Sequence, residues 1–404
     1  MKVIMLGWEL PPHNSGGLGV ACYGLCQALA NDGAMLEFVL PYTAPNQCDF
    51  MKIRAALPVN VKRVTATGNS YESFKYHHIG GKTSYHDLFG HQAAYEEAIA
   101  NLTFDDDFDI IHAHDWLTFR AALKLKQIYD KPVVLHVHSL ESDRAGGISG
   151  NSLVHAIERL GLESADKIIA VSAHTKQKII HDYGISEDKI EVSHNSISPD
   201  SHSPSLDDEN CYKVILALKK QGYTVLVNAG RLTIQKGLTN LLRAFARASD
   251  HNPKLLLLLA GSGEQRDELI ELAAELGASR NVFFTNFVRG NTLRDTYSIG
   301  DLFIMPSISE PFGLTPLESI LHGTPAMVSN QSGVAEVIAN VLKVDYWDID
   351  KMVSQIINIS QYPNLQSALQ DNGLYEVRRM GWHTASEKVF EIYGQLMPAT
   401  RATQ

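Results

Sequence analysis

The sequence predicts an α/β protein with two domains, each built on a doubly wound parallel sheet. The chain has 404 residues, which is more than a single ordinary hydrophobic core organises. Short apolar runs bounded by Gly, Pro, Asp or Asn recur along both halves, as the strands of buried parallel sheets do. Segments with a helical spacing of apolar residues lie between these runs, and this alternation of strand and helix is typical of α/β layers.

The apolar runs locate the expected strands, and the segments between them locate the expected helices. In the first half, strands are expected around 3–6, 38–40, 110–111, 133–135 and 168–171. In the second half, they are expected around 225–227, 255–260, 282–284, 302–305 and 326–328. Apolar residues recur at i, i+3, i+4 and i+7 in two segments, namely Leu238, Leu241, Leu242 and Phe245, and Leu269, Leu272, Ala273 and Leu276. Both segments are therefore expected to be amphipathic helices.

A polar stretch between the two halves marks the expected domain boundary. Residues 196–210 are rich in Ser, Pro and Asp, which is typical of a linker. We place the N-terminal domain at 1–200 and the C-terminal domain at 201–384. Segment 46–104 lacks a clear rhythm of strand and helix, so we expect an irregular insertion there that faces an acceptor or a partner.

The composition argues against a nucleic-acid partner and against a membrane-spanning segment. Asp and Glu number 45 against 35 Lys and Arg, and the formal net charge of −10 argues against a nucleic-acid partner. The four cysteines, Cys22, Cys26, Cys48 and Cys211, form no evenly spaced framework and are expected to be reduced packing residues. The first residues do not resemble a signal peptide, and no apolar run approaches the ~18 residues of a membrane span. We therefore expect a cytoplasmic protein and leave peripheral contact with a membrane open.

Two glycine-containing turns that follow expected strands would suit an anion. Residues 15–19 read SGGLG, and glycines let backbone N–H groups approach an anion at a helix N-terminus. Residues 230–237 read GRLTIQKG, in which Arg231 and Lys236 would grip a diphosphate beside the next helix. The alternatives are a tight strand-to-helix turn in the first case and a solvated basic turn in the second.

A third segment reads SEPFGLTPLE and places Glu310 and Glu318 eight residues apart. Gly313 interrupts the segment and predicts a loop for Glu310, whereas Pro316 suits a first helical turn and places Glu318 at the start of a helix. Backbone N–H groups of Gly313 and Leu314 would suit an oxygen-rich ligand, and Glu318 would accept hydrogen bonds from a ribose diol. For Glu318 the alternative is a charge that only stabilises the helix N-terminus.

Histidines follow two of the expected strands, as HAHDW at 112–116 and HVH at 136–138. They lie at the carboxyl ends of strands, where ligands of such sheets bind. We expect one histidine of each pair to pack and the other to face the ligand. A metal site formed by these histidines with Asp115 is the lesser alternative. The acidic run at 105–107 resembles a metal-binding D-x-D, but we expect it to be a solvated turn.

Together these motifs resemble those of the retaining glycosyltransferases of family 4, a group with the GT-B fold. The resemblance covers nearly the whole chain in the same order, through WELPP at 8–12, GGLG at 16–19, HAHDW at 112–116, HVHSL at 136–140, ADKIIAVS at 165–172, GRLTIQKG at 230–237 and EPFGLTPLE at 310–318. It implies two facing Rossmann-like domains with a deep cleft between them for a nucleotide sugar, and a C-terminal helix at 385–404 that joins the first domain. It also implies a metal-independent reaction with no cofactor besides the donor, a UDP- or ADP-sugar.

The resemblance further implies roles for individual residues. Arg231 and Lys236 would neutralise the donor diphosphate, Glu310 would lie under the transferred sugar, and His138 would approach the sugar near its 6-hydroxyl. The other donor contacts are assigned to Gly16, Gly17, Val288, Phe312, Gly313, Leu314 and Glu318, with Glu318 on the ribose. No residue is assigned to a metal.

We therefore expect a retaining transferase that moves a hexose, glucose above all, from a nucleotide-diphosphate sugar to a saccharide or glucan acceptor, nearest to the glucan synthases. One alternative is a transferase that acts on a lipid-linked acceptor at a membrane surface. Basic helix faces would then be supplied by Lys124, Lys126, Lys176 and Lys178. The other alternative is a non-catalytic protein that binds nucleotide sugars.

Overall fold

The computed structural model describes residues 1–13, 16–43, 48–63, 74–78, 84–85, 87–146, 150–199, 204–205 and 209–397. Contacts divide the chain into two units. The first unit contains Met1–Arg144, Ile148–Ser196 and Trp382–Gln404, and the second contains Ala145–Gly147 and Ile197–Gly381. The first unit is therefore discontinuous in sequence.

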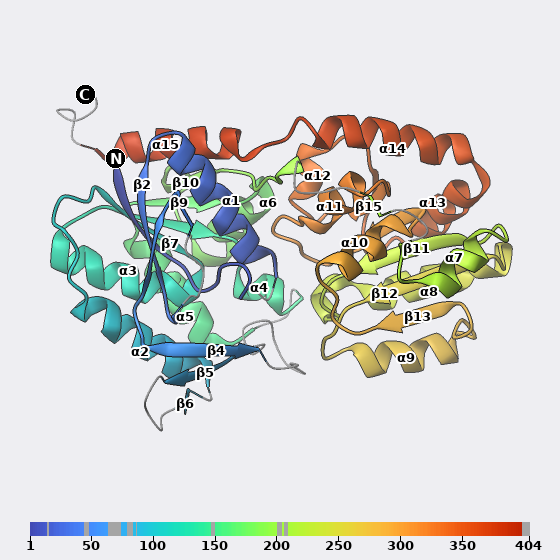
Figure 1. Ribbon diagram of the computed structural model, residues 1–404, viewed down its shortest axis with the longest axis horizontal. Coiled ribbons are helices and arrows are strands. Elements are labelled where there is room, and N and C mark those ends of the chain that lie inside the picture. The colour runs from blue at the N-terminus through green and yellow to red at the C-terminus, as the bar shows by residue number, and fades with distance from the viewer. Residues whose placement is uncertain are drawn as a thin grey trace. The chain divides into compact units, whose positions relative to one another are not determined.

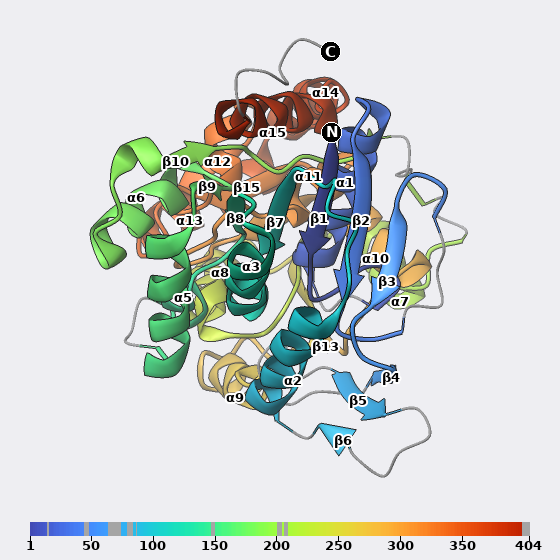
Figure 2. The same ribbon diagram turned by 90° about the vertical axis from the view of Figure 1, so that its left-hand side faces the viewer.

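Within the described residues, the first unit has a seven-stranded parallel sheet in the order β10-β9-β8-β7-β1-β2-β3 (Figures 1 and 2). Its strands are β1 (Lys2–Leu6), β2 (Met35–Leu40), β3 (Lys52–Ala55), β7 (Ile110–His114), β8 (Val133–Val137), β9 (Lys167–Ala170) and β10 (Ile190–Val192). Its helices are α1 (Gly17–Asn31), α2 (Leu88–Asn101), α3 (Trp116–Tyr129), α4 (Glu141–Arg144), α5 (Ser152–Ser164), α6 (Ala173–Tyr183) and α15 (Trp382–Leu396). A small antiparallel sheet adds β4 (Val59–Arg63), β5 (Phe74–His78) and β6 (Ser84–Tyr85).

Both faces of the first sheet are covered, as its apolar strands predict. Alternate residues of β1 point to opposite faces of the sheet: Ile4 and Leu6 pack in one core, and Val3 and Met5 pack in the other. A parallel sheet buried in this way needs apolar residues at consecutive positions, which explains why its strands read as unbroken apolar runs.

The helix α15 completes the core on one face of the first sheet. One side of this helix, formed by Trp382, Ala385, Val389, Ile392 and Tyr393, is buried in the same core as α1. These positions recur at helical spacing, and α15 lies beside α1 (Figure 1). The end of the described chain thus packs on the unit with which the chain began.

Within the described residues, the second unit has a six-stranded parallel sheet in the order β13-β12-β11-β14-β15-β16. Its strands are β11 (Thr224–Ala229), β12 (Leu255–Ala260), β13 (Val282–Thr285), β14 (Leu302–Met305), β15 (Ala326–Ser329) and β16 (Leu342–Val344). Its helices are α7 (Lys213–Lys219), α8 (Leu238–His251), α9 (Arg266–Glu275), α10 (Asn291–Ser298), α11 (Thr315–Leu321), α12 (Val334–Val337), α13 (Ile349–Gln361) and α14 (Pro363–Val377). Two Rossmann-like α/β sheets confirm the predicted fold class.

The prediction of an irregular insertion at 46–104 was wrong in part. The strand β3 pairs in parallel with β2 at the edge of the main sheet, and α2 contributes the buried residues Tyr95 and Ile99 to its core. The helix α2 was not predicted because it also buries the polar residues His91 and Gln92, which obscure its apolar periodicity. Among the described residues, no helix is both long enough and apolar enough to cross a membrane.

Candidate active site

The second sheet reverses its strand order between β11 and β14. Ligands of open α/β sheets bind at the carboxyl ends of the strands beside such a reversal. The loop after β11 carries Arg231 and Lys236, and the loop after β14 carries Glu310. The topology therefore places these three predicted residues on neighbouring loops at the position favoured for a ligand.

The loop after β11 is fixed by its backbone. The N–H of Leu232 donates to the Ser262 carbonyl at 2.9 Å, and the Leu232 carbonyl accepts from the Gln265 N–H at 3.0 Å. At the far end of the loop, Gly237 has a φ of 64°, and a Cβ atom there would lie 2.2 Å from the Pro306 carbonyl oxygen. Only glycine combines this backbone conformation with so close an approach. The loop is thus held against the end of β14.

The side chain of Gln235 ties this loop to the one that carries Glu310. Its Nε2 donates to the Ser309 carbonyl at 2.9 Å, and its Oε1 accepts from the Arg231 guanidinium at 3.2 Å. The Ile308 N–H donates to the Gln235 carbonyl at 2.8 Å. Sequence reasoning missed Gln235, which is buried and orients Arg231.

Lys236 and Glu310 form an ion pair between the two loops. The Lys236 ammonium donates to Oε2 of Glu310, and the Ser307 hydroxyl donates to the same oxygen at 3.0 Å. Glu310 is buried and Lys236 is half-buried. Because an unpaired buried charge is costly, each residue holds the other in place. The result is a positioned cation at the carboxyl end of the sheet.

The loop that follows Glu310 is rigid because it is paired with a second chain segment. The Glu310 N–H donates to the Gln331 carbonyl at 2.9 Å, and the Val334 N–H donates to the Phe312 carbonyl at 2.8 Å. Gly313 has a φ of 98°, and a Cβ atom on it would lie 2.7 Å from Cε of Met305. The side chain of Phe312 is buried, which is consistent with its assignment as a backbone contact.

Glu318 lies in the first turn of α11, as predicted, and is held there by a tyrosine. The hydroxyl of Tyr297 donates to Oε2 of Glu318 at 2.6 Å. Tyr297 is buried and stacks on His322, with 5.6 Å between ring centroids. Burial and then the Glu318 charge raise the pKa of Tyr297 well above its usual value, so the tyrosine remains a hydrogen-bond donor. Sequence reasoning missed Tyr297 because it lies on another helix, α10.

Replacing Tyr297 by phenylalanine is expected to raise the KM for the expected nucleotide-sugar donor about fivefold, because one hydrogen bond of about 1 kcal/mol no longer orients Glu318. Steady-state kinetics at varied donor concentration would measure this. Tyr212→Phe is the matched control, since it removes the hydroxyl that contacts Thr296 at 2.8 Å in the same unit. An unchanged donor KM in Tyr297→Phe would remove Glu318 from the donor site.

Two other predicted donor residues occupy surface loops of the second unit. Val288 is half-buried in the segment between β13 and α10. Leu314 is half-buried at the N-terminal boundary of α11. Both positions are compatible with backbone contacts to a ligand, and their assignment stays a prediction.

In the first unit, the strand order reverses between β1 and β7. Gly16 directly precedes α1, and Gly17 is its first residue, as the glycine-rich turn predicts. The buried carboxylate of Glu9 accepts a hydrogen bond from the Gly19 N–H at 3.2 Å. One N–H group of the first helical turn is therefore already used, and a phosphate contact at Gly16 and Gly17 stays a prediction.

The expectation that only one histidine of each pair packs was wrong, and the assignment of His138 to the ligand stays a prediction. His112, His114, His136 and His138 are all buried, and their rings form one stack across β7 and β8 and the loop after it. The ring centroids of His112 and His114 lie 4.6 Å apart, and those of His136 and His138 lie 4.3 Å apart. Residues two apart on a strand point to the same face, so each pair lies together.

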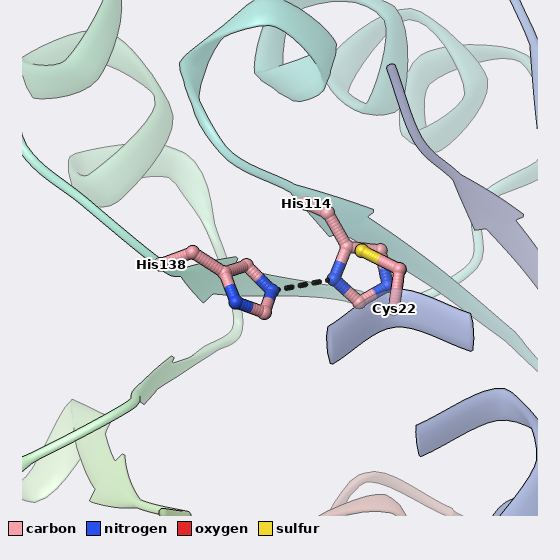
Figure 3. A group of neighbouring side chains, drawn as sticks. All are labelled: Cys22, His114 and His138. Carbon is pink, nitrogen blue, oxygen red and sulfur yellow. Dashed lines mark hydrogen bonds between the residues drawn. The ribbon is translucent and has the colours of Figure 1, made fainter. Parts of the chain in front are cut away.

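Hydrogen bonds link the four rings in pairs. Nδ1 of His114 and Nε2 of His138 are 3.0 Å apart (Figure 3), and Nε2 of His112 and Nδ1 of His136 are 3.2 Å apart. Nδ1 of His112 lies 2.6 Å from the hydroxyl of Tyr393 on α15. Burial lowers the pKa of all four residues, to about 3 for His138, so the rings are neutral near pH 7.

Asp115 fixes the segment that carries His138. Its Oδ1 accepts from the backbone N–H groups of His138 at 2.7 Å and Ser139 at 3.1 Å. Asp115 has a φ of 58° and a ψ of 166°, a backbone conformation that residues other than glycine rarely adopt, so the contacts around it hold a strained residue in place. Burial raises its pKa to about 6, although Arg144 and these hydrogen bonds oppose the shift.

A buried ionic network supports the segment after His138. The Arg144 guanidinium contacts Glu158 at 2.9 Å and Glu141 at 3.0 Å, and the Tyr183 hydroxyl donates to Glu158. Burial raises the pKa of Glu158 to about 7, although Arg144 opposes the shift. The folded state therefore holds a proton on Glu158 that the unfolded chain releases near pH 4.5.

Because the folded-state pKa of Glu158 is raised, its contribution to stability is present below pH 4.5 and is lost as pH rises towards 7. The free energy of unfolding of the wild type minus that of Glu158→Gln is expected to fall by about 3 kcal/mol across this window. Denaturant unfolding at a series of pH values would measure the difference. Glu163→Gln, at an exposed site on the same helix, is the control. A difference that does not vary with pH would contradict the prediction.

Three of the four lysines proposed as basic helix faces have acidic partners. Lys126 pairs with Asp166 at 2.7 Å, Lys176 with Glu187 at 3.3 Å, and Lys178 with Asp143. Paired in this way, they add little positive surface for a membrane.

The acidic run at 105–107 forms an exposed turn before β7, as predicted. Within it, Asp107 forms an ion pair with Lys2. The ion pair with Lys2 therefore balances one carboxylate of this acidic run without a metal.

Comparison with known proteins places the chain in a family. The profile described as Glycosyltransferase Family 4 matches residues 15–201, and the profile described as Glycosyl transferases group 1 matches residues 217–374. A glycosyltransferase of Methanocaldococcus jannaschii is 32% identical over 371 residues, which cover 88% of this chain and 89% of that protein. The chain belongs to glycosyltransferase family 4. A glycogen synthase of Mycobacterium tuberculosis is 30% identical, over 84% of this chain and 80% of that enzyme.

Solved structures agree with this family 4 assignment at the level of fold. Sucrose-phosphate synthase of Thermosynechococcus elongatus has a TM-score of 0.75 at 20% identity, covering 98% of each chain. Anabaena HepE in complex with UDP-glucose has a TM-score of 0.70 at 18% identity, and the match covers 98% of this chain and 100% of that chain. Starch synthase IV of Arabidopsis thaliana, bound to ADP and acarbose, has a TM-score of 0.70 at 17% identity, covering 98% and 99%. The fold is GT-B, and the family 4 enzyme is a retaining glycosyltransferase that uses a nucleotide-sugar donor.

Proposed function

We propose that this family 4 enzyme transfers glucose from UDP-glucose or ADP-glucose to a saccharide or glucan acceptor. The observation that carries the proposal is the ion pair between Lys236 and Glu310. It joins the loops after β11 and β14, which are hydrogen-bonded to each other where the strand order of the second sheet reverses. A positioned cation there suits a diphosphate, and a carboxylate beside it suits the hydroxyl groups of a sugar. We assign the second unit to the donor and the first to the acceptor.

In the proposed reaction, the bond between the anomeric carbon and the diphosphate oxygen breaks while a bond to an acceptor oxygen forms on the same face. The acceptor's proton passes to an oxygen of the leaving phosphate. Negative charge develops on the diphosphate, and Arg231 and Lys236 would stabilise it without reorganisation because Gln235 and Glu310 already hold them. Glu310 positions the sugar and stabilises the positive charge that develops on it; it is not the attacking group.

The remaining contacts follow from the same arrangement. Glu318, oriented by Tyr297, would bind the ribose diol, and the backbone around Gly313 would meet the sugar and phosphate oxygens. Val288 would contact the base through its backbone. From the first unit, Gly16 and Gly17 would meet the phosphate and His138 the sugar.

The choice of sugar and acceptor is supported by named relatives. One relative is a glycogen synthase, and two fold neighbours were solved with UDP-glucose and with ADP and acarbose. Glucose is the sugar named in the description of the UDP-glucose complex. A glucan or smaller saccharide as acceptor fits the same relatives.

A panel of nucleotides and nucleotide sugars in a thermal-shift assay would test the proposal first. UDP-glucose or ADP-glucose is expected to raise the melting temperature more than GDP-sugars do. Each stabilising donor would then be incubated with glucan and oligosaccharide acceptors. NMR of the product should show the α-anomer of the donor retained in the new linkage.

The proposal fails if neither glucose donor stabilises the protein or supports transfer while another sugar does. Tight binding of a glucose donor with neither transfer nor hydrolysis would instead revive the non-catalytic alternative.

A further inference from the structure

One tryptophan of the second unit faces solvent. The chain has four tryptophans, all of them among the described residues, and Trp347 is the exposed one. Trp347 is 59% exposed, whereas Trp8, Trp116 and Trp382 are 8% exposed or less. It lies in the loop between β16 and α13, at the carboxyl edge of the same sheet whose loop after β14 carries Glu310. An exposed indole leaves a large apolar surface in water, and aromatic rings placed in this way are typical of binding surfaces.

The loop that carries Trp347 is anchored by its own contacts. The ring of Tyr346 packs edge to face against Trp347, with 4.8 Å between the ring centroids. The Tyr346 carbonyl accepts from Nδ2 of Asn240 at 2.9 Å. On the other side of the tryptophan, the Asp348 side chain caps α13. A ring that is already held in place loses little conformational freedom when a ligand stacks on it.

Polar groups that suit the hydroxyls of a sugar lie beside the aromatic pair. Oδ1 of Asp345 accepts from Nδ2 of Asn330 at 3.0 Å and from Nε2 of Gln331 at 2.8 Å. These hydrogen bonds lower the pKa of Asp345, so its carboxylate is charged near pH 7. Within the described part of the chain, the other oxygen of Asp345 accepts no hydrogen bond, so it is available to a ligand.

Gln331 connects this group to the loop that carries Glu310. The Gln331 carbonyl accepts from the Glu310 N–H at 2.9 Å, and its side-chain Oε1 accepts from the Tyr346 N–H at 3.3 Å. The loops after β14, β15 and β16, three neighbouring parallel strands, are thereby tied together. A chain bound at Trp347 would lie on the same edge of the second unit as the proposed point of transfer.

We propose that Trp347, Tyr346 and Asp345 bind the chain of a glucan acceptor away from the point of transfer. This inference rests on the proposed function and extends it, because it makes the acceptor a polymer rather than a small sugar. Glucopyranose carries its hydroxyl groups equatorially, so the faces of the ring present C–H groups that pack on the electron-rich face of an indole. The hydroxyls then point sideways from the ring, where a carboxylate such as that of Asp345 accepts from them.

The exposed ring supplies a probe for this binding. Acrylamide quenches tryptophan fluorescence by collision, so Trp347 should be quenched in the free protein and the three buried tryptophans should not. Maltoheptaose, added without any nucleotide sugar, is expected to protect the quenched fraction in a saturable manner. Trp347→Phe should remove that fraction, which would identify Trp347 as its source.

Retardation in native gels that contain glycogen measures binding by the variants. Trp347→Ala is expected to raise the dissociation constant for glycogen about tenfold, and Trp347→Phe, which keeps an aromatic ring, only about twofold. Tyr362→Ala is the matched control and should bind like the wild type. Its tyrosine is 57% exposed on the same unit but lies outside the group.

The proposal is overturned if maltoheptaose gives no protection, or if Trp347→Ala and Tyr362→Ala are retarded equally. It is also overturned if Trp347 is shielded from acrylamide without sugar, because a second copy of the chain then covers the ring. Neither measurement uses a donor or an activity assay. A failure here therefore leaves the proposed transfer of glucose standing, and a failure of the donor panel leaves these binding results unchanged.

Discussion

Replacing Lys236 by alanine is expected to lower glycosyl transfer turnover by about 10²- to 10³-fold, the range found when one fixed charge-stabilising group is removed from an active site. The ammonium group is held at the carboxyl end of the second sheet by Glu310, and the proposed leaving diphosphate develops its charge there. Steady-state kinetics with the donor found in the thermal-shift panel would measure the loss. Lys254→Ala is the matched control, because this exposed lysine of the same unit donates to the Gln221 carbonyl.

The same substitution leaves Glu310 buried without its cation, so a loss of activity alone would be ambiguous. The single variant is expected to lose about 2 kcal/mol of stability. The double variant Lys236→Ala/Glu310→Gln should recover much of this stability, because the neutral amide can still accept from Ser307, but it should not recover turnover. Wild-type turnover in Lys236→Ala, or recovery of turnover in the double variant, would remove Lys236 from the catalytic site.

The largest loss of stability is expected from Gly237→Ala. The substitution forces alanine into a φ of 64° and places its Cβ 2.2 Å from the Pro306 carbonyl oxygen, which is backbone and yields only if β14 moves. The left-handed backbone of alanine is expected to cost about 1–2 kcal/mol, and the overpacking against Pro306 about 1–3 kcal/mol. Together they are expected to lower the free energy of unfolding by about 3–4 kcal/mol. Denaturant unfolding, followed by a signal from the second unit, would measure it.

Gly277→Ala separates the two causes of that loss. Gly277 has nearly the same φ, 68°, but no atom lies within 4 Å of the position of its Cβ. Its replacement is expected to cost only the backbone strain, about 1 kcal/mol. Equal losses in the two variants would show that the contact with Pro306 contributes nothing.

The apolar runs predicted the central strands well because a parallel sheet buried on both faces leaves its strands no polar positions. Each of the ten expected strands corresponds to one in the structure, from β1 to β15. The strands that were missed carry charged or polar residues, as β3 does at Lys52 and Arg54 and β10 does at Glu191. Edge strands are half exposed, and their sequences do not differ clearly from those of loops.

The candidate site was predictable where chemistry is local in sequence and not where it depends on packing. Glycine turns and charged residues after strands pointed to Arg231, Lys236 and Glu310. The supporting groups Gln235 and Tyr297 could not be found in this way, because each acts on a residue through a contact that only folding creates. The prediction for the histidine pairs failed for another reason: residues two apart on a strand share a face, so both histidines of a pair lie in the same stack.

The return of α15 to the first unit has a consequence for how the protein is made. When the ribosome has released residues 1–196, every strand of the first sheet exists, but the apolar surface of α1 that receives Trp382 and Tyr393 is still bare. The second unit is translated in the interval and can close its core before the first unit does. The unit translated first can thus finish folding last: a chain of which only residues 1–381 have left the ribosome carries a complete second unit and a first unit that still lacks α15.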